Sequence, residues 1–153
     1  MNSTKPILLV EDNDDDVRLT RRALHKNNIL NDLIVMKDGV EALAYLRAAV
    51  DLSGNREHGL PALILLDLKL PKMDGLEVLR ALRADPKLRR QPVVILTSSK
   101  EEQDILSSYD LGANSYIHKP VDFEQFSTAI NQLQLYWLIL NEPPPPPAGC
   151  AAA

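Results

Sequence analysis

Short apolar runs alternate with longer amphipathic segments along this chain of 153 residues. The alternation repeats about five times, which is typical of βα units that build a parallel sheet. The apolar runs predict five strands, at Ile7 to Val10, Leu33 to Met36, Ala62 to Asp67, Val93 to Thr97 and Ser115 to His118. The hydrophobic pattern therefore predicts an α/β fold.

Apolar positions at helical spacing predict five helices in the intervals between these strands. The predicted helices span Asp14 to Lys26, Val40 to about Ala49, Leu76 to Leu82, Glu101 to Leu111, and about Asp122 to Leu140. In the first helix, Val17, Thr20 and Leu24 form one face. In the second, the predicted apolar positions are Val40, Leu43, Ala44 and Leu46.

Proline and glycine mark the ends of these segments. Asp85-Pro86 stops the third helix, and Gly112 is placed to cap the fourth. The stretch from Asp51 to Pro61 has the composition of a surface loop. Five consecutive prolines after Glu142 cannot continue a helix.

We expect one domain over residues 5–141 and a proline-rich tail over residues 142–153, since this length suits a single core.

Composition narrows the classes of partner. The hydrophobic share of 45% and charged share of 25% are ordinary for a globular protein, and the net charge is −4. Arg21-Arg22 and Arg89-Arg90 are isolated pairs, so we expect no nucleic-acid partner. The run Leu135 to Leu140 is too short to cross a membrane, and the start carries no export signal. We expect a cytoplasmic protein, whose single Cys150 excludes an intramolecular disulfide.

Polar residues stand where four of the predicted strands end. Glu11-Asp12 follow the first strand, Asp67 ends the third, Thr97 ends the fourth, and Lys119 follows the fifth. The carboxyl ends of parallel strands meet at one edge of the sheet, where open α/β folds place their ligands. The pattern therefore predicts a site with three carboxylates, a hydroxyl and an ammonium.

Each of these residues has an ordinary explanation when it is taken alone. An isolated Asp at a strand end usually caps a turn, a threonine there bonds to nearby backbone, and a lysine is a solvated charge. Three carboxylates together repel one another unless a cation intervenes, and Mg²⁺ binds a few carboxylates with water and phosphate oxygens. A carboxylate can also be the nucleophile of a phosphoryl transfer, so Asp67 is the candidate phosphoryl acceptor.

The same residues carry a family resemblance: the chain resembles a response-regulator receiver domain of two-component signalling. The matching motifs occur in family order over about Lys5 to Leu140. They are Leu8-Leu9-Val10-Glu11-Asp12, Leu65-Leu66-Asp67-Leu68, Leu70-Pro71, Met73-Asp74-Gly75, Leu96-Thr97, Gly112-Ala113, Tyr116 and Lys119-Pro120. The resemblance implies a flavodoxin-like fold, which is a doubly wound five-stranded parallel sheet with strand order 2-1-3-4-5.

The resemblance also implies how the acidic site works. Asp67 would accept a phosphoryl group from a phosphohistidine of a sensor histidine kinase, with Mg²⁺ as cofactor. Asp12, Asp67 and the backbone carbonyl of Lys69 would be direct Mg²⁺ ligands, and Glu11 would complete the acidic pocket through water. The protein would be a phosphoacceptor in signalling rather than an enzyme.

Thr97, Lys119 and Tyr116 would respond to the phosphoryl group. By the same resemblance, Thr97 and Lys119 assist its transfer, Thr97 and Tyr116 form a switch pair, and the Lys119-Pro120 bond is cis. A phosphoryl group adds charge and acceptor oxygens near Thr97, whose hydroxyl can move and leave space for Tyr116. The face of the fourth helix, fifth strand and fifth helix would then change.

The chain has no second domain in which to expect an output activity, so the output is predicted to be a protein contact. The run Leu135 to Leu140 is apolar on every side, which favours an interface, and a homodimer through the fourth helix, fifth strand and fifth helix face is the simplest form. The chain is similar to the small response regulators that partner cyanobacterial and bacterial phytochromes. The similar features are the ending with Trp137, the loop before Ala62, and the sequence from Leu66 to Pro71.

Three other functions are compatible with parts of the pattern. A haloacid-dehalogenase-type phosphatase needs a second acid two residues after its nucleophile, and Lys69 stands there. A nucleotide-binding loop is disfavoured: Gly54 and Gly59 have its spacing, but Leu60-Pro61 replaces the required Lys-Ser/Thr. A receiver-like scaffold that binds partners without phosphorylation stays open as the alternative function.

Overall fold

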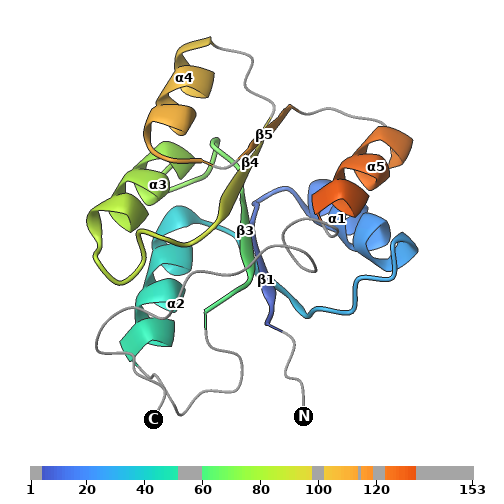
Figure 1. Cartoon of the computed structure of the whole chain (residues 1–153), viewed down its shortest axis with the longest axis horizontal. Coiled ribbons are helices and arrows are strands. Elements are labelled where there is room, and N and C mark those ends of the chain that lie inside the picture. Colours follow the sequence, from blue (N-terminus) through green and yellow to red (C-terminus); the bar gives the residue numbers. More distant parts are fainter. Residues whose placement is uncertain (1–4, 52–59, 98–101, 114, 119–122, 134–153) are drawn as a thin grey trace.

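A computed structural model describes residues 5–51, 60–97, 102–113, 115–118 and 123–133 of the chain. Five strands alternate with five helices through these residues (Figure 1). In chain order the elements are β1 (Ile7–Val10), α1 (Asp14–Lys26), β2 (Leu33–Met36), α2 (Gly39–Asp51), β3 (Leu63–Leu66), α3 (Gly75–Ala84), β4 (Val93–Thr97), α4 (Glu102–Asp110), β5 (Ser115–His118) and α5 (Phe123–Leu133).

The five strands form one parallel sheet with the order β2-β1-β3-β4-β5. Ile7 at the start of β1 pairs with Leu33 on one side and with Leu63 on the other. The chain thus steps outward from β1 to β2, then crosses back over β1 to β3. This reversal confirms the predicted doubly wound α/β fold, and it places the carboxyl ends of β1 and β3 side by side.

Alternation along the strands divides the core into two layers. One layer, with β1 residues Leu8 and Val10, packs under α2 and α3, while the other, with Ile7 and Leu9, packs under α1. Figure 1 shows α2, α3 and α4 on one face of the sheet and α1 and α5 on the other. Every residue of β1 and β3 is buried because both of their faces are covered by helices.

Local capping explains where the helices begin. Asn13 precedes α1 and its side chain accepts a hydrogen bond from the amide of Asp16, followed by three aspartates in the first turn. Asp74 and Glu77 form a reciprocal capping box at the start of α3. The first helix has the predicted bounds, and its Val17, Thr20 and Leu24 are buried as expected.

The predicted apolar face of α2 was wrong in two positions. Val40 is 49% exposed and Ala44 is exposed, whereas Leu43 and Leu46 are buried as predicted. At 3.6 residues per turn, Val40 and Ala44 lie about 200° around the helix from Ala42 and Leu46 respectively. The face that meets the sheet therefore passes through Ala42 and Leu46, and the other two side chains point to solvent.

Several predicted features lie outside the described residues. They are most of the loop before Pro61, Lys119 and Pro120, the apolar run from Leu135 to Leu140, Cys150 and the proline-rich tail. The fourth helix is described from Glu102, and the fifth from Phe123 to Leu133. None of the helices within the described ranges combines the length and the apolar character that crossing a membrane requires.

Candidate functional site

Backbone hydrogen bonds bring the ends of three strands together. The amide of Asp67, just after β3, donates to the carbonyl of Val10 at the end of β1 (3.1 Å). The amide of Glu11 donates to the carbonyl of Met36 at the end of β2 (2.9 Å). The residues that follow β1 and β3 are therefore held next to each other by the sheet itself.

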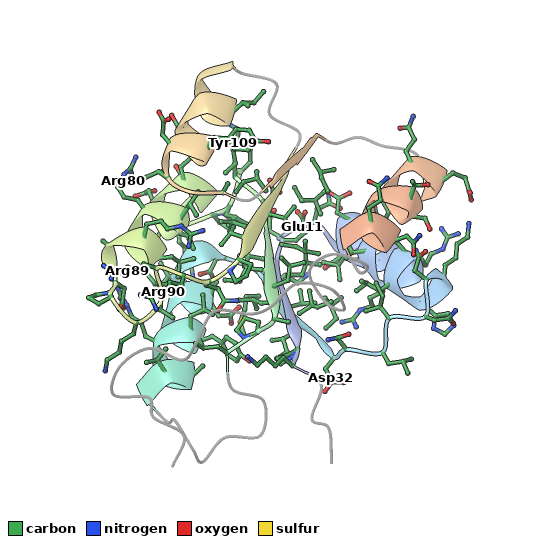
Figure 2. All side chains as sticks on the ribbon, in the orientation of Figure 1. Glu11, Asp32, Arg80, Arg89, Arg90 and Tyr109 are labelled. Carbon is green, nitrogen blue, oxygen red and sulfur yellow. The ribbon has the colours of Figure 1, made fainter. Side chains whose placement is uncertain are left out.

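Three carboxylates meet at this edge. One carboxylate oxygen from each of Glu11, Asp12 and Asp67 lies within 4.8 Å of the other two. Glu11 is 1% exposed and Asp67 is 5% exposed, whereas Asp12 reaches solvent. Figure 2 shows Glu11 and Asp32 at opposite ends of the sheet, with Glu11 between the two helical layers. The predicted acidic cluster is thus assembled by β1 and β3.

Two loop amides orient the buried carboxylates. The amide of Asn13 donates to Oε2 of Glu11 (3.2 Å), and the amide of Lys69 donates to Oδ1 of Asp67 (3.2 Å). Each bond closes a short turn around the carboxylate two residues earlier, as Asx-type turns do. These bonds restrain the side chains at the mouth of the site before any ligand binds.

Helix α3 starts against the backbone of the site. The amide of Gly75 donates to the carbonyl of Leu68 (2.9 Å), and Gly75 is buried against the backbone of Asp67 and Leu68. The β3–α3 loop also contains Lys72 with a positive φ of 66°. The absence of a side chain at Gly75 lets α3 begin close to the candidate phosphoryl acceptor.

Ion pairs surround the acidic cluster. The ammonium of Lys37 hydrogen-bonds the carboxylate of Asp14, and this contact lowers the pKa of Asp14. The amide of Glu41 donates to Oδ1 of Asp38 (2.7 Å) and lowers the pKa of Asp38, with a further contribution from Lys72, whose Nζ lies 3.5 Å from Oδ2. Each of these two rim carboxylates therefore has a lysine partner beside the cluster of like charges.

The donor set at the centre suits a hard divalent cation. Three carboxylates within reach of one ion match the oxygen chemistry of Mg²⁺, which retains water and phosphate ligands. No histidine or cysteine contributes to this group of carboxylates, so the set does not resemble a zinc site. The residues that are present therefore fit the metal that the sequence predicts.

The structure describes the strands that carry two of the three residues predicted to respond to a phosphoryl group. Thr97 is the last residue of β4 and pairs in register with His118, while Tyr116 of β5 pairs with Ile95. The two residues thus belong to β4, which lies beside β3, and to β5, which lies beside β4. Lys119 lies outside the described residues.

Sequence reasoning missed three contributors to the site region. Asn13 was not recognised as the cap of α1, although an Asn before an acidic first turn is a known signal. Gly75 was seen only as part of a motif. The side chain of Lys69, whose Nζ lies 3.7 Å from Oδ2 of Asp104 in α4, had no signal in the sequence, because the partners are 35 residues apart.

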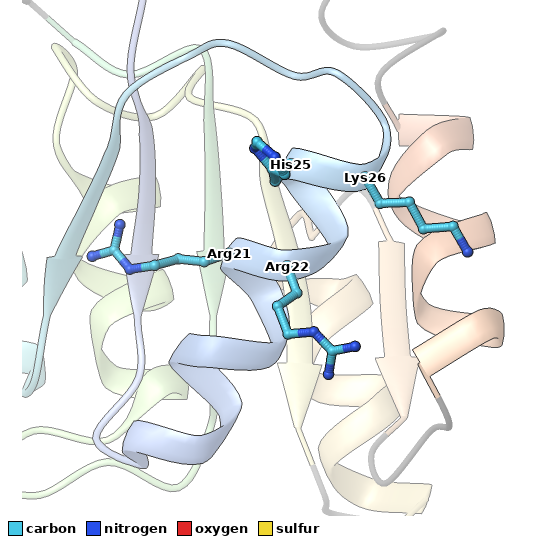
Figure 3. A pocket seen from close by; sticks show the side chains of 4 residues that line it. All are labelled: Arg21, Arg22, His25 and Lys26. Carbon is cyan, nitrogen blue, oxygen red and sulfur yellow. The ribbon is translucent and has the colours of Figure 1, made fainter.

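A basic depression lies on α1, away from the acidic cluster. Its lining consists of Arg21, Arg22, His25 and Lys26. Figure 3 shows these four side chains leaving the helix in different directions, with Lys26 reaching toward α5, where it pairs with Glu124 (2.9 Å). The depression occupies the second half of α1, whereas the carboxylates lie before its start. Its donors do not converge on one point as a bound anion would require.

Comparison with known proteins agrees with this geometry. The family described as Response regulator receiver domain matches residues 7–131. Response regulator Rcp1 of Synechocystis sp. (strain ATCC 27184 / PCC 6803 / Kazusa) is 39% identical over 137 residues, covering 90% of this chain and 91% of that protein.

Two solved structures resemble the chain over most of its length. The phosphorylated cyanobacterial phytochrome response regulator RcpA superposes with a TM-score of 0.80 at 42% identity, covering 94% of this chain and all of that one. The Mn²⁺-bound form of Rcp1 superposes with a TM-score of 0.78 at 39% identity, covering 92% of this chain and 99% of that one.

Proposed function

The chain belongs to the response-regulator receiver family of two-component signalling, and from this premise we propose that it accepts a phosphoryl group on Asp67. The family consists of signalling proteins rather than conventional enzymes. The observation that carries the proposal is the meeting of Glu11, Asp12 and Asp67 at the carboxyl edge of the sheet. The Lys69 amide that restrains Oδ1 of Asp67 supports the same role.

The acceptor step follows from the position of Asp67. A carboxylate oxygen of Asp67 forms the new O–P bond while the P–N bond to a kinase histidine breaks, and the imidazole nitrogen keeps the electron pair. Asp12, Asp67 and the backbone carbonyl of Lys69 would hold Mg²⁺ directly, and Glu11 would assist through water. The bound cation would offset the negative charge of the phosphoryl oxygens.

The remaining residues have proposed roles after the transfer. Lys119 would pair with a phosphoryl oxygen, and the Thr97 hydroxyl would donate to another. Movement of Thr97 would then make room for Tyr116 and change the face of α4, β5 and α5. The placement of Thr97 and Tyr116 on neighbouring strands supports this exchange.

The proposed donor is a sensor histidine kinase of the phytochrome class. The structure that resembles this chain at 42% identity is described as a phosphorylated cyanobacterial phytochrome response regulator. We place the protein in the cytoplasm with such a kinase. Mixing the chain with candidate autophosphorylated kinases and following loss of phosphoryl mass from each kinase would identify the donor.

A homodimer is the proposed form of output. Residues 5–141 would make the receiver domain, whose face of α4, β5 and α5 would be extended by the apolar run that contains Trp137, with residues 142–153 as a tail. Sedimentation of the wild type and of Trp137→Ala across concentration measures this association. A wild type that sediments as a monomer at every concentration contradicts the dimer.

Phosphorylation itself is tested with a small donor. Incubation with acetyl phosphate and Mg²⁺ should add one phosphoryl group to the wild type, as measured by intact mass. Asp67→Asn should gain none, while Asp32→Asn, which alters an exposed carboxylate at the other end of the sheet, should behave as the wild type. A wild type without added mass would support the alternative, a scaffold that binds partners unphosphorylated.

A further inference from the structure

Lys69 contacts two functional parts of the molecule at once. Its amide donates to Oδ1 of Asp67 (3.2 Å), while its Nζ lies 3.7 Å from Oδ2 of Asp104, the third residue of α4. The Lys69 side chain is 61% exposed and the Asp104 side chain is 15% exposed. A single residue therefore joins the candidate phosphoryl acceptor to the first turn of α4.

The two ends of α4 are held by different kinds of contact. At the carboxyl end, Arg83 donates from Nε to the carbonyl of Leu111 (3.0 Å) and from a terminal nitrogen to the carbonyl of Gly112 (2.7 Å). At the amino end, the pair with Lys69 is longer and one partner faces solvent. Forked guanidinium bonds are stronger than an exposed ammonium pair. A change of charge near Lys69 therefore acts on the weaker end of the helix.

Phosphorylation of Asp67 would bring such a change. A phosphoryl group carries about −1.5 to −2 charges and three acceptor oxygens, compared with the single charge of Asp104. The ammonium of a lysine is a compact point charge on a flexible four-carbon stem, so it can turn to a new partner without moving the backbone. The Lys69 backbone is already bonded to Asp67, which places the base of that stem beside the new charge.

We propose that Lys69 is a cation with two positions: it pairs with Asp104 while Asp67 is unmodified, and with the phosphoryl group once Asp67 carries one. Phosphorylation then loosens the first turn of α4 by removing this ion pair. This inference rests on the proposed function of Asp67. It assigns the side chain of Lys69 a coupling role in addition to the proposed role of its carbonyl.

Hydrogen exchange of the α4 amides tests the proposal in the full chain. The four proteins are the wild type, Lys69→Met, Asp104→Asn and the double variant, each with and without beryllofluoride and Mg²⁺ as the phosphoryl mimic. Without the mimic, each single variant should exchange about 1.5- to 5-fold faster than the wild type, and the double variant no faster than the singles. With the mimic, all four should exchange at the same raised rate.

Lys72→Met is the matched control, because Lys72 lies on the same loop but pairs with Asp38 in front of α2. It should leave the α4 amides at their wild-type rates in both states. Additive effects of Lys69→Met and Asp104→Asn without the mimic would overturn the proposal. A coupling between positions 69 and 104 that persists with the mimic would overturn it as well.

Intact mass after acetyl phosphate treatment separates this inference from the proposed function. If the wild type gains a phosphoryl group but the hydrogen-exchange rates of α4 do not follow the expected pattern, the two-position role of Lys69 is wrong and Asp67 remains the acceptor. If the wild type gains no phosphoryl group, both proposals fail together.

Discussion

Gly75 approaches Asp67 so closely that a Cβ atom at position 75 would lie 2.3 Å from the Asp67 carbonyl oxygen. The nearest obstacle is backbone, which cannot rotate away as a flexible side chain would. Any side chain at position 75 must therefore displace either the start of α3 or the end of β3. The end of β3 carries the candidate phosphoryl acceptor.

Gly75→Ala is expected to destabilise the fold by about 1–3 kcal/mol, the usual cost of forcing extra atoms into a packed site. Because Asp67 would shift with the loop, its Mg²⁺ affinity should also fall about tenfold or more. Denaturant titration and isothermal titration with Mg²⁺ measure the two effects. Arg80→Ala, on the exposed side of the same helix, should leave both near wild type. Wild-type Mg²⁺ affinity in Gly75→Ala would contradict this reading of the contact.

Asp12→Asn should change stability in opposite directions with and without metal. In the metal-free protein, the substitution removes a negative charge that lies close to Glu11 and Asp67, so the free energy of unfolding should rise by about 1 kcal/mol. With Mg²⁺, the wild type should become the more stable protein, because it retains the carboxylate that binds the ion. Thermal melts with EDTA and with excess Mg²⁺ measure both. The same order of stability in the two buffers would show that Asp12 is no ligand.

Arg83 is expected to be a major contributor to stability. Its half-buried guanidinium donates to four backbone carbonyls, those of Leu111, Arg89, Gln91 and Gly112. Burial lowers the pKa of this guanidinium. Arg83→Leu should cost about 2–4 kcal/mol because the carbonyls lose a charged donor.

Arg83→Lys should recover only part of that loss, since an ammonium cannot reproduce the fork. Arg90→Lys, an exposed arginine in the loop before β4, is the control and should change stability by less than about 0.5 kcal/mol. Chemical denaturation gives all three values. If Arg83→Lys proves as stable as the wild type, then charge, and not the forked geometry, is what matters at this position.

Asp38 should make stability depend on pH in the acidic range. Its folded-state pKa is lowered, chiefly by the hydrogen bond from the Glu41 amide and further by Lys72. The pKa of an Asp in the unfolded chain is about 3.9. The charged form therefore stabilises the fold above about pH 4, and this stabilisation is lost as the pH falls through the lowered folded-state pKa.

Asp38→Asn retains an oxygen that can cap α2 but has no charge to titrate. The wild type should exceed this variant in stability at pH 7, and the difference should be smaller at about pH 3, below the pKa of an unfolded Asp. Urea titrations at both pH values provide the comparison, with Asp110→Asn as an exposed control. An unchanged difference at the two pH values would show that the charge of Asp38 does not stabilise the fold.

Much of this protein was determined by the sequence itself. Strand and helix periodicities are local, so they located all five strands and the first helix to within a residue or so. The same local pattern put Asp67 and the Glu11-Asp12 pair at strand ends, and parallel geometry then predicted the cluster that the structure contains. The family motifs supplied the strand order.

Only the tertiary structure decided which surfaces meet. Hydrophobic spacing could not distinguish the inward face of α2 from the outward positions Val40 and Ala44, because apolar residues occupy both. The partners of Arg83 are backbone carbonyls. Every residue has a carbonyl, so no pattern of side chains in the sequence predicts which ones Arg83 binds. Lys69 and Asp104 are ordinary surface residues until the fold brings β3 and α4 to the same edge. Local order follows from neighbouring residues, whereas these contacts depend on chain segments that only folding brings together.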